Sequence, residues 1–222
     1  MKLTQKKKNN SHQIFSFFLN LFSLCFFVFS SSFVWIYFWY ISLLCFQIYQ
    51  YIFLMDFGTG STSSSFPSTT FGYTYDVFLS FRGKDTRNNF VGHLYTALDN
   101  KGIYTFKDDE KLQRGTSIES ELFKAIEESR FAVVILSIDY ASSSWCLIEL
   151  AKIIECMEKT GLTVLPVFHR VDPSDVRHLK GVFEKAFVEH SVRFEDKIDE
   201  VNNWRDALVK VANIAGWDLR DR

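Results

Sequence analysis

Short apolar runs alternate with longer amphipathic segments from residue 73 onward. Four runs are short and almost unbroken, as buried strands are, and they cover residues 75–81, 102–106, 131–137 and 163–168. The run FAVVILS at 131–137 is apolar at nearly every position, which is typical of a central strand in a parallel sheet. The hydrophobic pattern therefore predicts a sheet of at least four strands.

The segments between these strands carry apolar residues at helical spacing. Gly102 and Gly161 mark two helix ends, and a weak fifth strand is expected after the fourth helix. The expected helices cover residues 88–102, 115–130, 143–161 and 180–190, with a last helix built on Trp204, Ala207, Leu208, Val211, Ala212 and Ala215 and ending at Gly216.

Strands that alternate with helices in this way predict an α/β fold. We expect a doubly wound parallel sheet with right-handed crossovers. Such sheets bind ligands outside the carboxyl ends of their strands. The loops expected at that edge are residues 82–87, 107–115 and 137–145.

The N-terminal part of the chain has a different composition. Residues 1–13 are basic, and residues 14–55 are apolar and uncharged. A membrane span needs about 20 residues, so residues 14–55 would form one span, or two spans broken near Ser30–Ser32. The lysines at positions 6–8 favour a cytosolic N-terminus; two spans would return the following domain to the cytosol, and one would not.

A second interpretation of this segment is that translation normally starts at Met55. Residues 1–54 would then be upstream sequence that is not normally coding. In both interpretations residues 56–72, rich in Gly, Ser and Thr, are a flexible linker to the folded part.

Charge and cysteine content exclude some function classes. Four of the 25 basic residues lie in the first ten positions, so residues 56–222 hold 21 basic and 26 acidic side chains. This acidic balance argues against general nucleic-acid binding. The four cysteines show no metal-ligand or disulfide spacing, so we expect no metal site and a reducing, cytoplasmic compartment for the folded part.

One glutamate is a candidate for chemistry. In SSSWCLIELAK, residues 142–152, Glu149 follows Trp145 and Cys146 by four and three positions, so the three side chains share a helix face. Taken alone, the pattern also fits a solvated glutamate near the helix start, stabilised by the helix dipole. In that case removing the carboxylate would cost little stability.

Several sequence blocks resemble those of plant TIR domains, in the same order and at the same spacing. The resemblance covers residues 73 to about 217 and identifies 73–222 as a TIR domain. The matching blocks are YDVFLSFRGKDTR, KGIYTFKDDEKLQRG, ELFKAIEESRFAVVILS, YASSSWCLIELAKIIEC, VLPVF and VDPSDVRHLKGVFEKAF.

The resemblance implies a flavodoxin-like fold and a role in plant immune signalling. Many plant TIR domains hydrolyse NAD+ after self-association, and the family's catalytic glutamate corresponds to Glu149. NAD+ is then a substrate, and no prosthetic group is implied. The alternative is a non-catalytic adaptor that acts through TIR–TIR association. The partners implied are NAD+ and other TIR domains, with membrane attachment through residues 14–55 if that segment is made.

The resemblance also implies further site residues. Expected substrate contacts are Arg82, Gly83, Lys84, Asp85, Thr86, Gly115 and Trp145, and expected self-association residues are His93 and Gly181. Lys84 stands where the family usually has an acidic residue, and Gly92 stands where it commonly has serine.

The expected chemistry explains why one carboxylate would suffice. Cleavage of the nicotinamide–ribose bond passes through an oxocarbenium-like state, which a nearby carboxylate stabilises. Nicotinamide is already a good leaving group, so no separate general acid is required.

Overall fold

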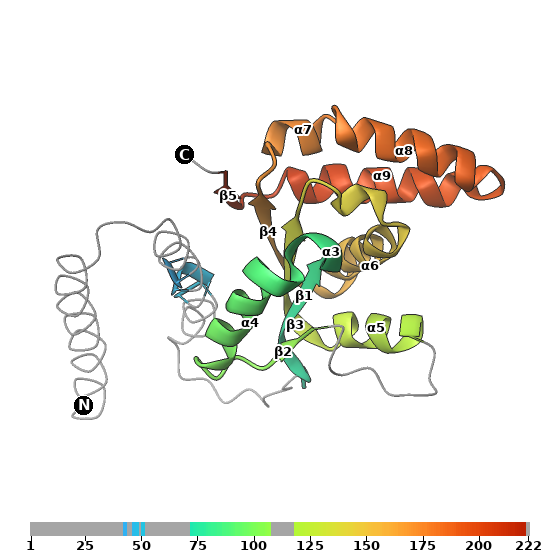
Figure 1. Cartoon of the computed structure of the whole chain (residues 1–222). Helices are drawn as coiled ribbons and strands as arrows, with labels where there is room; N and C mark the ends of the chain where they lie inside the picture. Colours follow the sequence, from blue (N-terminus) through green and yellow to red (C-terminus); the bar gives the residue numbers. More distant parts are fainter. Residues whose placement is uncertain (1–41, 44–45, 49, 52–71, 108–117, 221–222) are drawn as a thin grey trace, which may run out of the picture. The chain divides into compact units, whose positions relative to one another are not determined.

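The computed structural model describes residues 42–43, 46–48, 50–51, 72–107 and 118–220 (Figure 1). The basic N-terminus, most of the apolar segment, all of the linker except residue 72, and Gly115 lie outside these ranges. Within them, no helix combines the length and the hydrophobicity that a membrane span requires.

The described fold is built on a parallel sheet of five strands in the order β2-β1-β3-β4-β5. This order confirms the predicted α/β architecture. It also makes the gap between β1 and β3 a switch point, where crossovers leave in opposite directions. The strands are β1 (Tyr75–Phe81), β2 (Thr105–Phe106), β3 (Ser129–Leu136), β4 (Thr163–His169) and β5 (Trp217–Leu219).

Helices connect the strands and cover the sheet (Figure 1). On one face, Phe78, Val134 and Phe168 join a core with residues of three helices, α5 (Ile118–Glu127), α6 (Ser144–Thr160) and α9 (Ile198–Ala212). The helical segments are α3 (Gly83–Thr86), η1 (Arg87–Val91), α4 (Gly92–Asp99), α5 (Ile118–Glu127), η2 (Tyr140–Ser142), α6 (Ser144–Thr160), α7 (Pro173–Arg177), α8 (Val182–Arg193), η3 (Glu195–Lys197) and α9 (Ile198–Ala212).

Helix α6 carries the candidate glutamate, and its ends follow from the sequence. Ser143 caps the N-terminus, because its Oγ accepts a hydrogen bond from the Cys146 backbone N–H at 3.4 Å. Gly161 ends the helix in the left-handed conformation, with φ 80°. The helix predicted over 143–161 is thus confirmed.

The C-terminal part corrects two predictions. The fifth strand follows the last helix, whereas we expected it after the fourth, and α9 ends at Ala212, which leaves Ala215 exposed. Gly216 does not stop the helix. A Cβ at Gly216 would lie 2.3 Å from the Pro166 carbonyl oxygen, so glycine allows β5 to approach β4.

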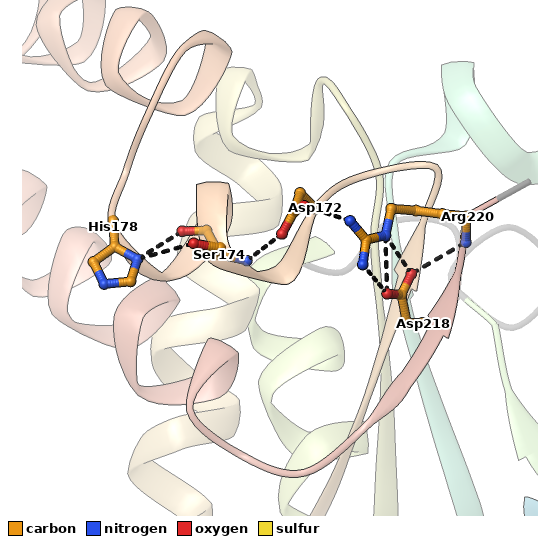
Figure 2. Close-up of polar contacts among 5 residues, drawn as sticks. All are labelled: Asp172, Ser174, His178, Asp218 and Arg220. Atoms are coloured by element: carbon orange, nitrogen blue, oxygen red, sulfur yellow. Dashed lines mark hydrogen bonds and ion pairs between the residues drawn. The ribbon is translucent and has the colours of Figure 1, made fainter. Parts of the chain in front are cut away.

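Polar contacts hold the short edge strand β5 against α7 (Figure 2). Arg220 forms an ion pair with Asp172, and its Nε also donates to both carboxylate oxygens of Asp218 at 3.0 and 2.9 Å. Asp172 in turn caps α7 by accepting from the Ser174 backbone N–H at 2.8 Å. These contacts tie the end of the described chain to the loop that follows β4.

Candidate active site

The candidate site lies where β1 and β3 end, at the switch point of the sheet. Glu149 reaches this edge from the second turn of α6, which follows β3 through η2. Its side chain is buried, with 3% exposure. The interpretation of Glu149 as a solvated residue near the helix start is therefore wrong. The reason is its position on the packed face of α6, between Cys146 and Ile153, which are also buried.

Two buried hydroxyl groups connect Glu149 to the rest of the site. The Ser80 Oγ, on β1, donates to Glu149 Oε2 at 3.1 Å and lies 2.8 Å from the Tyr140 Oη. The Tyr140 hydroxyl is also placed to donate to the Cys146 carbonyl oxygen, at 3.2 Å. β1, η2 and α6 thus meet at one carboxylate.

The electrostatic surroundings keep Tyr140 protonated. Burial raises the pKa of Tyr140 well above its ordinary value, and the neighbouring Cys146 and Glu149 raise it further. The phenol is therefore a hydrogen-bond donor at every pH near neutrality.

The segment after β1, which we expected to be a loop, forms the short helix α3 and is held by contacts within the protein. Asp85 accepts from Arg82 Nη1 and from Ser137 Oγ, both at 2.5 Å, and so joins the loops that follow β1 and β3. Thr86 is fully buried, and its hydroxyl donates to the Arg82 carbonyl oxygen at 3.2 Å. Lys84, in contrast, is exposed. Asp85 and Thr86 thus shape the loop that we expected to contact substrate.

Gly83 has a packing role in the same loop. A Cβ at this position would lie 2.6 Å from Nη2 of Arg87, so the guanidinium rests against the glycine backbone. The same guanidinium lies over the Phe81 ring, with Cζ 5.6 Å from the ring centroid. A larger residue at position 83 would displace Arg87.

The other expected site residues lie on different elements. Trp145 is half-buried and packs against the core one turn before Glu149. His93 is half-buried on α4. Gly181 is exposed and comes directly before α8, with φ 63°. Figure 1 shows α4 and α8 in different parts of the fold.

A separate groove of about 650 Å³ lies between α5, α6 and α9, and Glu149 does not line it. Its three lysines already have carboxylate partners: Lys152 with Glu127, Lys197 with Glu200, and Lys210 with Glu158. Among the described residues, no group of three or more His, Cys, Asp or Glu side chains is arranged to hold a metal ion. The buried Glu149 is the better candidate for chemistry.

Comparison with known proteins shows which family the fold belongs to. The model of the TIR domain family matches residues 74–222. The chain belongs to the TIR domain family.

Its relatives are plant disease-resistance proteins. TMV resistance protein N of Nicotiana glutinosa is 51% identical over 156 residues, which are 70% of this chain and 14% of that protein. Disease resistance protein RPV1 of Vitis rotundifolia is 53% identical over 161 residues, 72% of this chain and 11% of that protein. The chain thus spans only a small part of the length of these relatives.

A solved structure shares the fold at high sequence identity. The TIR domains of the activated Roq1 resistosome, which recognises the pathogen effector XopQ, match with a TM-score of 0.64 and 59% identity. The match covers 67% of this chain and 89% of that one. The resemblance to plant TIR domains is confirmed.

Sequence reasoning missed two residues of the site, Ser80 and Tyr140. Ser80 was visible as a polar residue in the otherwise apolar stretch 77–81, and Tyr140 as an aromatic residue in the segment before α6. Nothing in the sequence alone indicates that their hydroxyls meet at Glu149, because Ser80 and Glu149 are 69 positions apart.

Proposed function

We propose that this TIR domain is an NAD+ hydrolase whose nucleotide products act in plant immune signalling. The observation that carries the proposal is the buried Glu149 carboxylate at the switch point of the sheet. Burying a charge costs free energy unless hydrogen bonds compensate, so such groups are concentrated where chemistry needs them. An adaptor that acts only through TIR–TIR contacts has no need of a buried carboxylate there.

In the proposed reaction, the bond between the nicotinamide nitrogen and ribose C1′ breaks. The bonding electron pair goes to the nicotinamide ring, which becomes neutral, and positive charge develops on the ribose. The Glu149 carboxylate stabilises this charge in surroundings of low dielectric constant. Water then adds at C1′ and releases its proton to solvent; attack by an adenine nitrogen instead would give a cyclic product.

Trp145 and the loop after β1 supply the surroundings of the substrate in this proposal. The half-buried indole offers an aromatic surface one turn from the carboxylate. The exposed Lys84 offers positive charge for the phosphates. Arg82 is ion-paired with Asp85 and Asp139 at 2.5 and 3.3 Å, so a phosphate would have to compete with these carboxylates for it. Gly115 lies outside the described residues and stays a predicted substrate contact.

Assembly is part of the proposal. The matching Roq1 TIR domains come from an activated resistosome, and we infer that association of TIR domains likewise activates this chain. His93 on α4 and the region around Gly181 are the proposed contact surfaces. Because Gly181 has a positive φ, Gly181→Arg would strain the backbone, so His93→Ala is the cleaner test of association.

The test is NAD+ consumption by the purified full-length chain over a hundredfold range of protein concentration. We expect nicotinamide release, with a specific activity that rises with concentration and falls in His93→Ala together with self-association. Glu149→Gln should lose about 10²- to 10³-fold in activity. The matched control is Glu155→Gln, on the same helix, where the carboxylate is half-buried and ion-paired with Lys159 at 2.8 Å. Absence of nicotinamide release at all concentrations would refute the enzymatic proposal.

A further inference from the structure

Two hydroxyl groups on the sheet side of Glu149 have no role in the reaction described above. Ser80 and Tyr140 are both fully buried, and Ser80 lies on a strand that is otherwise apolar over its buried part. An apolar side chain at position 80 would need no hydrogen-bond partner. The Ser80 hydroxyl is therefore not needed for packing, and its role lies in its hydrogen bonds to Glu149 and Tyr140.

Counting protons gives the direction of the hydrogen bonds. Ser80 and Tyr140 each have one hydroxyl proton, and the three contacts are Ser80–Glu149, Ser80–Tyr140 and Tyr140–Cys146 carbonyl. A carbonyl and a carboxylate only accept. A charged acceptor makes the stronger bond, so the Ser80 proton goes to Glu149. Tyr140 then donates to Ser80 Oγ or to the Cys146 carbonyl.

The arrangement holds the carboxylate from outside its own helix. Ser80 is on β1 and Tyr140 is on η2, so the orientation of Glu149 is set by elements other than α6. Because Glu149 is 3% exposed, bulk water is a poor substitute for the Ser80 donor. Stabilisation of a developing charge depends on groups that are already oriented before the reaction.

We propose that Ser80 is a positioning residue that orients the Glu149 carboxylate for catalysis, with Tyr140 as the second hydroxyl of the same device. The proposal rests on the proposed NAD+ cleavage. Ser80 acts on Glu149 and does not touch the substrate.

The first test is the kinetics of Ser80→Ala. A hydrogen bond to a charged group supports an expected loss in kcat of about ten- to hundredfold, with KM for NAD+ nearly unchanged. Ser80→Cys keeps the size and a weak donor, and should recover part of the loss. The matched control is Ser129→Ala. Ser129 is also a buried strand serine, but its Oγ donates to the Ala125 carbonyl oxygen at 2.6 Å, at the start of β3.

The second test needs no turnover. In protein labelled with 13C at glutamate carboxyl carbons, the NMR titration of Glu149 should move to higher pH in Ser80→Ala, because the carboxylate loses a donor. Ser80→Ala keeps the titratable side chains of Tyr140, on η2, and Cys146, on α6; it removes a hydrogen bond that lowers the pKa of Tyr140, so that phenol stays protonated. Ser129→Ala should leave the titration of Glu149 in place.

The two tests separate the two proposals. A shifted titration in a protein that does not cleave NAD+ would refute the proposed function and keep the positioning role of Ser80. An unshifted titration, with a kcat equal to that of Ser129→Ala, would overturn the positioning role.

Discussion

Replacing Glu149 with glutamine should remove activity without removing stability. The amide keeps the volume of the side chain and an oxygen that can accept the hydrogen bond from Ser80. In the unmodified protein this bond joins Ser80 Oγ to Glu149 Oε2 at 3.1 Å. The substitution removes the charge and replaces the other carboxylate oxygen with an NH2 group. The two properties are therefore expected to separate in this one variant.

The magnitude of the stability effect follows from burial. Taking a carboxylate out of water costs several kcal/mol, and glutamine avoids most of that cost. Against this, the hydrogen bond from Ser80 weakens by about 1 kcal/mol when its acceptor becomes neutral. Because Glu149 is 3% exposed, the first effect outweighs the second. We expect Glu149→Gln to be as stable as the unmodified protein, or more stable.

Glu149→Ala should behave differently. It leaves a void beside β1 and leaves the buried Ser80 hydroxyl without its carboxylate acceptor, so we expect a loss of about 1–3 kcal/mol. The sequence-based expectation of almost no cost assumed an exposed side chain and is replaced by this larger value. Both variants should lose NAD+ cleavage by about 10²- to 10³-fold, the usual effect of removing one electrostatic stabiliser.

The assay combines thermal unfolding with nicotinamide release, measured on the same preparations of the full-length chain. A change of 1 kcal/mol moves the Tm of a chain of this size by about 2–4 °C, which is readily measured. A glutamine variant that retains more than a tenth of the activity would show that the charge is not catalytic. A glutamine variant that unfolds several degrees earlier would show that Glu149 is mainly structural.

Two further predictions follow from the geometry. The raised pKa of Tyr140 means that the unfolded state loses this phenol proton at lower pH than the folded state does. The contribution of Tyr140 to the free energy of unfolding is thus constant well below pH 10 and falls above about pH 10, by at most about 1.4 kcal/mol per pH unit. In Tyr140→Phe, the free energy of unfolding measured with urea should decline less steeply between about pH 9 and 11. Gly216→Ala should destabilise the protein by about 1–3 kcal/mol, because the added Cβ meets the Pro166 carbonyl oxygen at 2.3 Å and displaces β5. Wild-type amide protection in β5 of the alanine variant, measured by hydrogen exchange, would contradict the second prediction.

The sheet was predictable because its main strands are long apolar runs. β1, β3 and β4 match the predicted positions within one or two residues, since buried parallel strands have few polar positions. β5 was misplaced because it covers only Trp217–Leu219, and its pairing with β4 depends on the missing side chain of Gly216. No local pattern of three residues indicates a strand.

The candidate site was predictable only in part. The resemblance to TIR domains indicated Glu149, and the helical stripe of Cys146, Leu150 and Ile153 contained enough information to place Glu149 on the buried face. The hydrogen-bond partners of the carboxylate could not be predicted from the sequence. Ser80 and Tyr140 are 60 positions apart, and their contact is a property of the folded sheet that no spacing rule expresses.

The elements that meet at Glu149 are each held by contacts outside the carboxylate itself. His190, a buried residue of α8, donates from Nε2 to the Ala141 carbonyl oxygen at 2.8 Å and so holds η2, which carries Tyr140. The cap at Ser143 holds the start of α6, and β1 is paired on both sides by β2 and β3. A carboxylate whose supports are themselves fixed in place keeps its geometry. The elements around Glu149 therefore orient the charge in advance, which is what the proposed reaction requires of it.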